Sequence, residues 1–262
     1  MTATGGGDFG MLNNNPSFNL TSIYHIYSTG MTSLFNYGDH GPNKFSSTAN
    51  SLLFYGSAYK APMYTLFQRD RFDAAEPWSM FWYDPTYVRA SSLPATYSNT
   101  PFHRVSGAFW TDLALDHVFD DPQSSWASFR TSWTDNDGMY IAMKASKLTA
   151  HQTHGDLDCG DFVLDAMGQR WAGELGSADY LGAGYFSSED QNSARWFWYR
   201  KMTEGQNTLN VNGANQLVTA APTIKWQTSG TQQGSSTVLD IPQKSTAYFV
   251  ADLTSAYGVY VH

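Results

Sequence analysis

The chain has 262 residues, a formal net charge of −8, 42% hydrophobic residues and only 15% charged residues. This balance excludes a disordered chain, and it argues against a nucleic-acid partner because phosphate contacts need clustered Lys and Arg. A single cysteine, Cys159, excludes an internal disulfide framework, and the apolar runs are too short for a membrane-spanning helix.

Short helices are predicted in the first third of the chain, after an irregular opening whose residues MTATGGGDFG lack the features of a signal peptide. Apolar residues recur at roughly helical spacing, and Pro62 and Pro77 mark a restart and a first turn. We predict helices at 21–34, 44–60, 61–72 and 74–86, with a turn cluster at 35–43. Residues 1–89 are therefore expected to form a helical segment.

Strands are predicted in the remainder of the chain. Residues 90–106, rich in Ser, Thr and Pro, predict a linker or surface insertion, and the hydrophobic period changes after them. The predicted strands are 124–134, 139–145, 161–167, 195–202, 207–212 and 246–254, with DNDG at 135–138 as a hairpin turn. We predict an α+β chain in which 107–262 forms an antiparallel β-sandwich.

Residues 151–210 concentrate ionisable and aromatic side chains between short predicted strands. Buried carboxylates and imidazoles cost several kcal/mol unless they are paired or bound to a metal, so such a concentration predicts a functional site. The 16% aromatic content is typical of proteins whose aromatic rings pack on sugars, and an aromatic-rich β core is the alternative. His154 is the first candidate, because three acidic residues, Asp156, Asp158 and Asp161, follow it in a loop before a strand. His151 is a second candidate, and a solvated surface histidine is the alternative for both.

Oxygen donors from three separate segments, Asp156, Glu174 and Gln206, form a candidate metal set. Such a set suits Ca²⁺, Mg²⁺ or Mn²⁺ better than Zn²⁺, which prefers His and Cys. The alternative is structural: Glu174 would pair with Arg170 or Arg200, and Gln206 would satisfy the backbone.

Substrate contacts are predicted for four further side chains. Arg200 and Asn207 offer donors for a carboxylate, and Trp171 and Tyr185 offer aromatic faces for sugar rings. In a domain that only binds carbohydrate, Trp196 would offer a further aromatic face. Plain packing is the alternative for each of them. The phosphate-binding loop, the dinucleotide glycine motif and the serine-hydrolase elbow do not occur, which disfavours those chemistries.

The segments HGDLDCGDFVLDAMGQRWAGELGSADY and YFSSEDQNSARWFWYRKMTEGQNTLN resemble the core of the heparinase II/III-like polysaccharide lyases, in particular fungal members. Residues 35–70 resemble the last helices of that family's incomplete α/α toroid. The resemblance implies a toroid joined to an antiparallel β-sandwich, an extracellular location, and β-elimination on uronic-acid polysaccharides. In that reaction a neutralised uronate carboxylate acidifies the C5 proton, which a Tyr or His removes as the C4 oxygen departs.

The family pattern also implies roles for individual residues. His154 matches the first His of the family's His-x-His-x-Asp motif, Asp156 stands where a metal-binding His is usual, Glu174 stands at the acidic ligand, and Gln206 stands where another His is usual. A divalent cation (Ca, Mn or Zn) is thus implied, with an altered ligand set. The family's catalytic Tyr has no match here, so we expect an internal fragment with weak or no activity of its own. The alternatives are a non-catalytic carbohydrate-binding β-sandwich and a structural domain stabilised by a cation.

Overall fold

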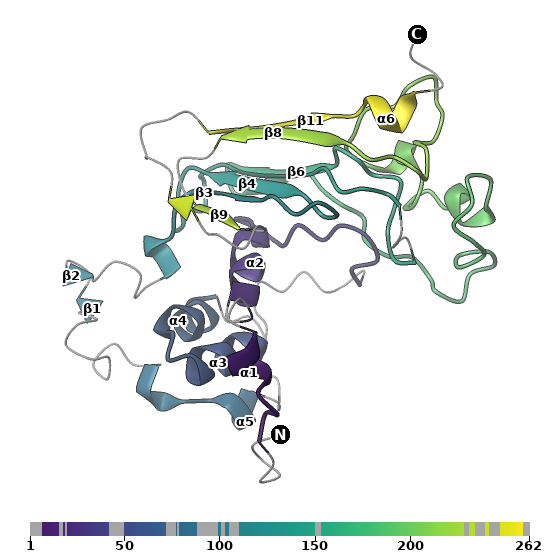
Figure 1. Ribbon diagram of the computed structural model, residues 1–262. Helices are drawn as coiled ribbons and strands as arrows, with labels where there is room; N and C mark the ends of the chain where they lie inside the picture. Colours follow the sequence, from purple (N-terminus) through teal and green to yellow (C-terminus); the bar gives the residue numbers. More distant parts are fainter. Residues whose placement is uncertain are drawn as a thin grey trace. The chain divides into compact units, whose positions relative to one another are not determined.

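The computed structural model describes residues 7–15, 18, 20–41, 50–71, 77, 79–87, 99–100, 103–104, 110–149, 153–227, 231–233, 239–240 and 247–258 (Figure 1). The chain packs into two units, residues 1–29 with 46–113 and residues 30–45 with 114–262. Among the described residues, no helix has the length and hydropathy needed to cross a membrane. The predicted linker at 90–106 lies mostly outside the described residues, as does His151.

The first unit is mainly helical. Its elements are α1 (Met11–Asn14), α2 (Thr21–Ser28), α3 (Asn50–Ala58), α4 (Pro62–Asp70), α5 (Ser79–Trp82), the 3-10 helices η3 (Pro85–Tyr87) and η6 (Trp110–Asp112), and the paired strands β1 (Asn99–Thr100) and β2 (His103–Arg104). Helices α3 and α4 pack closely, because a Cβ at Gly56 of α3 would collide with Thr65 of α4. The helix predicted at 21–34 ends early, since Ser28 and Thr29 both donate hydrogen bonds to the His25 carbonyl and Thr29 is extended.

The second unit is built on β-sheet. Its strands are β3 (Asp116–Phe119), β4 (Trp126–Arg130), β5 (Tyr140–Lys144), β6 (Phe162–Ala166), β7 (Gln169–Ala172), β8 (Thr223–Gln227), β9 (Thr231–Gln233), β10 (Leu239–Asp240) and β11 (Tyr248–Asp252). Seven strands form one sheet in the order β10-β9-β3-β4-β5-β6-β7, and β8 with β11 forms a second, smaller layer over it (Figure 1). The predicted α+β class, with helices before a β-sandwich, is confirmed, although β3 and β9 run parallel to each other.

The hairpin predicted from DNDG is confirmed. Strands β4 and β5 pair antiparallel from Arg130 and Tyr140 onwards, and the Gly138 N–H donates to the Asp135 carbonyl at 3.1 Å. Two predicted strands are wrong. Residues 195–202 contain the 3-10 helix η7 (Ala194–Phe197), because the Ser193 side chain accepts a hydrogen bond from the Arg195 N–H and caps a tight turn. Residues 207–212 form no strand and follow another short helix, η8 (Thr203–Gly205).

The segment of residues 30–41, which forms neither a helix nor a named strand, is fixed to the large sheet by one buried ion pair. Asp165 of β6 is fully buried and accepts hydrogen bonds from the backbone N–H groups of Met31 (2.8 Å) and Thr32 (3.0 Å). Arg170 of β7 pairs with Asp165 and donates to the carbonyls of Ser33 and Leu34. The segment therefore has a fixed course on the sheet, which brings its later residues to the loop that carries His154.

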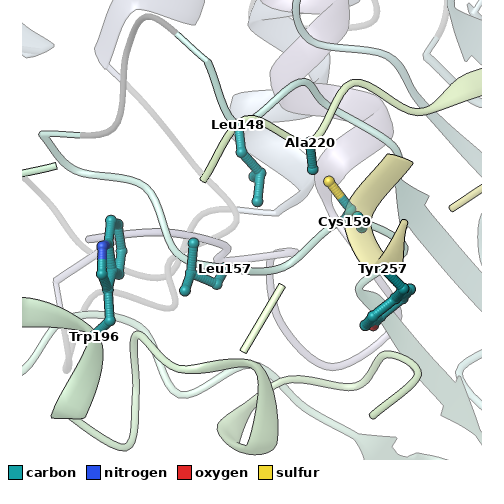
Figure 2. Packing of buried hydrophobic residues seen from close by; sticks show 7 residues of the cluster. Leu148, Leu157, Cys159, Trp196, Ala220 and Tyr257 are labelled. Carbon is teal, nitrogen blue, oxygen red and sulfur yellow. The ribbon is translucent and has the colours of Figure 1, made fainter. Parts of the chain in front are cut away.

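A small hydrophobic cluster holds the loop that carries His154 through two buried side chains of that loop. Leu148, Leu157, Cys159, Trp196, Ala220, Ala256 and Tyr257 form this cluster, and the last two belong to α6 (Thr254–Tyr257) (Figure 2). Cys159 is a buried thiol, and its Sγ lies 3.2 Å from the Ser146 carbonyl oxygen. Because Leu157 and Cys159 point into the cluster, the residues between and beside them are held at defined positions.

Candidate functional site

The loop from 153 to 161 exposes its histidine and buries its carboxylates. The His154 side chain is 61% exposed. Asp156, Asp158 and Asp161 are all buried. Gly160 closes the loop in the left-handed region at φ +83, where a Cβ would also strike Leu253. The loop thus separates an accessible imidazole from a buried acidic group.

Asp39, from the segment 30–41, joins the two parts of this site. Its backbone N–H donates to the His154 carbonyl at 2.9 Å, and its Oδ2 lies 3.1 Å from His154 Nδ1. Its Oδ1 accepts hydrogen bonds from Lys201 Nζ at 2.9 Å and from the Tyr185 hydroxyl. Gly38 makes this approach possible, since it has φ +67 and a Cβ there would lie 2.8 Å from the His154 carbonyl oxygen.

Two aromatic rings flank the imidazole. The Tyr180 ring stacks on His154 with 5.9 Å between centroids, and the Phe186 ring meets the imidazole edge-on at 5.7 Å. The Tyr180 hydroxyl lies 3.4 Å from His154 Nδ1. Desolvation, followed by the charge of Asp39, raises the pKa of Tyr180, so this hydroxyl keeps its proton at neutral pH. His154, Tyr180 and Phe186 form one partly exposed surface, which we call the imidazole platform.

Beneath the platform, buried charges of opposite sign are paired incompletely. Lys201 Nζ contacts Asp39 at 2.9 Å and Asp156 at 3.2 Å, and Lys144 pairs with Asp158. Arg195 is also buried, and its positive charge acts on Asp39 and Asp156. Two ammonium groups and this guanidinium therefore oppose five buried carboxylates, which are Asp39, Asp156, Asp158, Asp161 and Glu174. This imbalance leaves negative charge in a region from which water is excluded.

The pKa values of three of these carboxyl groups are shifted upward. Burial raises the pKa of Asp156 to about 7, against the opposing charge of Lys201. Burial and the nearby Asp158 raise the pKa of Asp161 to about 7, and burial and Asp161 raise that of Glu174 well above its usual range. Asp161 and Glu174 are neighbours close enough to share one proton.

The three predicted metal ligands are all buried, and each has one oxygen without a hydrogen-bond partner among the described residues: Asp156 Oδ2, Glu174 Oε2 and Gln206 Oε1. Their other polar atoms are occupied, Asp156 Oδ1 by Lys201, Glu174 Oε1 by two backbone N–H groups and Gln206 Nε2 by the Arg200 carbonyl. No three His, Cys, Asp or Glu side chains in the described part of the chain are arranged to hold a metal ion. The donor chemistry here, two carboxylates and one amide, fits an oxygen-preferring cation.

The structural alternative for Glu174 does not hold. Arg170 pairs with Asp165, and Arg200 donates to the carbonyls of Leu175 and Ser177. Glu174 instead accepts hydrogen bonds from the N–H groups of its own turn, at Leu175 and Gly176. Its second oxygen is thus left for the proton shared with Asp161 or for a cation.

The four predicted substrate contacts are placed very differently from one another. Trp171 is 65% exposed, with its Nε1 donating to the Ala166 carbonyl, so its side chain is accessible from solvent. Tyr185, like Trp196, is 1% exposed, and a buried ring has no face for a sugar; its contribution is the hydroxyl on Asp39. Asn207 donates both amide hydrogens to the carbonyls of Phe162 and Gly173, which makes it a structural tie. Arg200 likewise ties the turn that follows Glu174.

Two parts of the site were missed by sequence reasoning. Asp39 falls only within the predicted turn cluster at 35–43, and no role is predicted for Lys201. A glycine directly before an aspartate is a signal of close backbone approach as well as of a turn, but the partner of Asp39 lies 115 residues away. Tyr180 likewise has no predicted role, although it lies within the aromatic-rich stretch 151–210.

Comparison with known proteins gives a family and a fold. A family model described as heparinase II/III-like, C-terminal, matches residues 116–257. The crystal structure of the heparan sulfate lyase HepC from Pedobacter heparinus is 16% identical, with 79% of this chain and 25% of that chain covered and a TM-score of 0.47. A structure titled heparinase III is 14% identical, with 85% of this chain and 29% of that chain covered and a TM-score of 0.50.

At these identities the structural likeness concerns the fold alone, and this chain spans less than a third of the length of either solved chain. A comparison with the curated proteins finds no match. The family model, however, covers more than half of the chain and includes the entire loop of His154, Asp156 and Asp161. The chain belongs to the heparinase II/III-like family.

Proposed function

We propose that this chain contributes to a polysaccharide-lyase active site that cleaves uronic-acid-containing glycans by β-elimination. One observation carries the proposal: the accessible imidazole of His154 is held at Nδ1 by Asp39 and lies beside the Tyr180 hydroxyl. Elimination needs one group that accepts the C5 proton and one that donates a proton to the departing C4 oxygen. The imidazole platform supplies a group of each kind within a few ångströms.

In the proposed reaction, His154 takes the C5 proton, and the electron pair of that C–H bond forms the C4–C5 double bond. The C4–O bond breaks, and its electrons go to the leaving oxygen, which receives a proton from Tyr180. The raised pKa of Tyr180 supports this role, because the hydroxyl enters the reaction protonated. The C5–H and C4–O bonds are broken, and the second C4–C5 bond and the O–H bond of the leaving group are formed. One proton goes to His154 and one comes from Tyr180, with no oxidant, reductant or added water.

The substrate class follows from the family and from this chemistry. Only a sugar with a carboxyl group at C5 has an acidic C5 proton, so we propose an acidic polysaccharide as substrate, and an extracellular site of action where such polymers occur. The test is a panel of heparan sulfate, alginate and glucuronan, followed by the ultraviolet absorbance of the unsaturated product. The 262-residue chain is assayed alone and, where the gene encodes a longer product, within that complete product. We expect turnover by the complete product and weak turnover by the chain itself.

A carbohydrate-binding domain without chemistry is the second candidate, and the exposure of the aromatic Trp171 side chain favours it. The same panel separates the two functions. Saturable binding of a glycan by the complete gene product, with no unsaturated product from any member of the panel, contradicts the lyase proposal and supports the binding domain. Release of unsaturated product establishes the lyase.

We also propose that an oxygen-preferring cation such as Ca²⁺ or Mn²⁺ binds between Asp156, Glu174 and Gln206. The support is the one unsatisfied buried oxygen on each side chain and the surplus negative charge around them. At about pH 7.5 we expect Ca²⁺ or Mn²⁺ to raise the melting temperature and a chelator to reverse that rise. At a cation concentration one hundred times Kd, the free energy of unfolding should increase by about 2.7 kcal/mol. Glu174→Gln should abolish the effect, whereas Glu189→Gln, at an exposed position, should not.

If a proton shared by Asp161 and Glu174 neutralises these buried carboxylates instead of a cation, stability should depend on pH and not on added cations. The raised pKa of Asp161 means that the folded protein keeps a proton that the unfolded chain releases near the ordinary aspartate value of 3.8. The free energy of unfolding then falls as the pH rises from about 4 to about 7, since the folded state binds more protons over that range. A fall of this kind, with no response to added cations at any pH, contradicts the cation proposal.

A further inference from the structure

We propose that Asp39 is a positioning residue that fixes His154 as the Nδ1–H tautomer and so presents the Nε2 lone pair to the substrate. The contact is Asp39 Oδ2 to His154 Nδ1 at 3.1 Å, between segments far apart in the sequence. Its catalytic meaning rests on the proposed lyase function. The tautomer itself is a property of the protein without substrate and can be measured separately.

The hydrogen bonds around Asp39 set the direction of this contact. Asp39 Oδ1 already accepts from the Lys201 ammonium and the Tyr185 hydroxyl, which identifies the group as an ionised carboxylate. An ionised carboxylate only accepts, so the hydrogen between Oδ2 and Nδ1 belongs to the imidazole. A neutral imidazole with its hydrogen on Nδ1 has its lone pair on Nε2.

Tyr180 does not compete for the same nitrogen. Its hydroxyl lies 3.4 Å from Nδ1, beyond the usual range for an O–H···N contact, and equally 3.4 Å from the Asp39 carbonyl oxygen. The Nδ1 hydrogen is already directed at the Asp39 carboxylate. Tyr180 therefore supports the ring by stacking, while Asp39 decides which nitrogen carries the hydrogen.

Asp39 cannot turn away from the imidazole. Its side chain is 2% exposed, and its backbone N–H donates to the carbonyl of the same histidine that its side chain contacts. Gly38 holds the two backbones in close contact, and the Asp165–Arg170 pair fixes the segment upstream. A side chain that is 61% exposed would otherwise sample several ring orientations, so this double contact orients the base before substrate arrives.

The test is nitrogen-15 NMR of histidine-labelled protein at about pH 8.5, where an ordinary imidazole is neutral. The wild-type protein should show His154 with its hydrogen on Nδ1. In Asp39→Asn, the amide oxygen must accept from Lys201 and Tyr185, so the NH₂ group faces His154 and makes Nδ1 an acceptor. That variant should show the hydrogen on Nε2, the same reversal expected when Asn replaces the Asp of a catalytic triad. Tyr180→Phe is the matched control and should leave the tautomer unchanged.

A wild-type spectrum with the hydrogen on Nε2 overturns the proposal, as does an unchanged tautomer in Asp39→Asn. Should Asp39→Asn fail to fold, the wild-type and Tyr180→Phe spectra still decide, since only the Asp39 contact predicts the Nδ1–H form in both. On a glycan that is cleaved, Asp39→Asn should lower kcat by on the order of 100-fold or more with little change in KM. If the tautomers are as expected but no glycan is cleaved, Asp39 still positions His154, and the proposed lyase function is rejected.

Discussion

Replacement of Lys201 by Met is expected to lower the free energy of unfolding by about 3–5 kcal/mol near pH 7.5, the usual cost of removing one partner of a buried ion pair. Lys201 is fully buried, and its ammonium contacts Asp39, Asp156 and the Gly155 carbonyl. Methionine fills similar space over the Tyr185 ring but leaves both carboxylates without a counter-charge. Chemical unfolding followed by tryptophan fluorescence measures the loss.

The loss should depend on pH in a defined direction. Burial raises the pKa of Asp156 to about 7 even with Lys201 present, so the folded state holds this proton at a pH where the unfolded chain has released it. The contribution of Asp156 to the free energy of unfolding is fully present below the ordinary aspartate pKa of 3.8. It is lost as the pH rises towards the folded-state pKa of about 7. Without Lys201 the pKa of Asp156 rises further, so the variant should lose most stability above pH 7 and least near pH 5.

Lys225→Met is the matched control, because Lys225 is exposed on β8. This substitution should change the free energy of unfolding by no more than about 0.5 kcal/mol at either pH. Equal effects of the two substitutions would contradict a buried charge network around Lys201. A loss at Lys201 that does not vary with pH would contradict the part assigned to Asp156.

Local signals in the sequence were sufficient for much of the fold. Pro62 marks the start of α4, and DNDG marks the turn between β4 and β5, because each acts on the backbone at its own position. The same local reasoning failed at 195–202. There the alternation of buried Trp196 and exposed Phe197 arises from successive tight turns, and a period of two does not distinguish such turns from a strand.

The candidate site shows the same division between local and long-range information. His154 and Asp156 could be predicted as site residues because several ionisable side chains directly before an apolar run are an unusual local pattern. Asp39 and Lys201 were not found, since their roles exist only after the segment 30–41 has been laid along the sheet and η7 has turned Lys201 inward. Nothing in the residues adjacent to Asp39 predicts which histidine it will meet.

His154→Ala is expected to lower the rate of elimination by on the order of 10²- to 10⁴-fold, the usual contribution of a general base. The substrate is whichever glycan of the panel is cleaved, and the measured quantities are kcat and KM. His154 is 61% exposed, and among the described residues its side chain contacts the platform rings and Asp39. Its removal should therefore leave the fold and glycan binding in place. The decrease should therefore fall on kcat, with KM changed little.

Thr153→Ala tests whether the effect belongs to the imidazole or to the loop. Thr153 is the adjacent exposed residue, and its hydroxyl contacts Glu189, outside the platform. This substitution disturbs the same turn without removing a proton acceptor, so its kcat should match that of the unaltered protein. If His154→Ala retains full turnover, the base is another group. If it instead weakens glycan binding as much as it slows turnover, His154 is a contact residue and the platform is a sugar-binding surface.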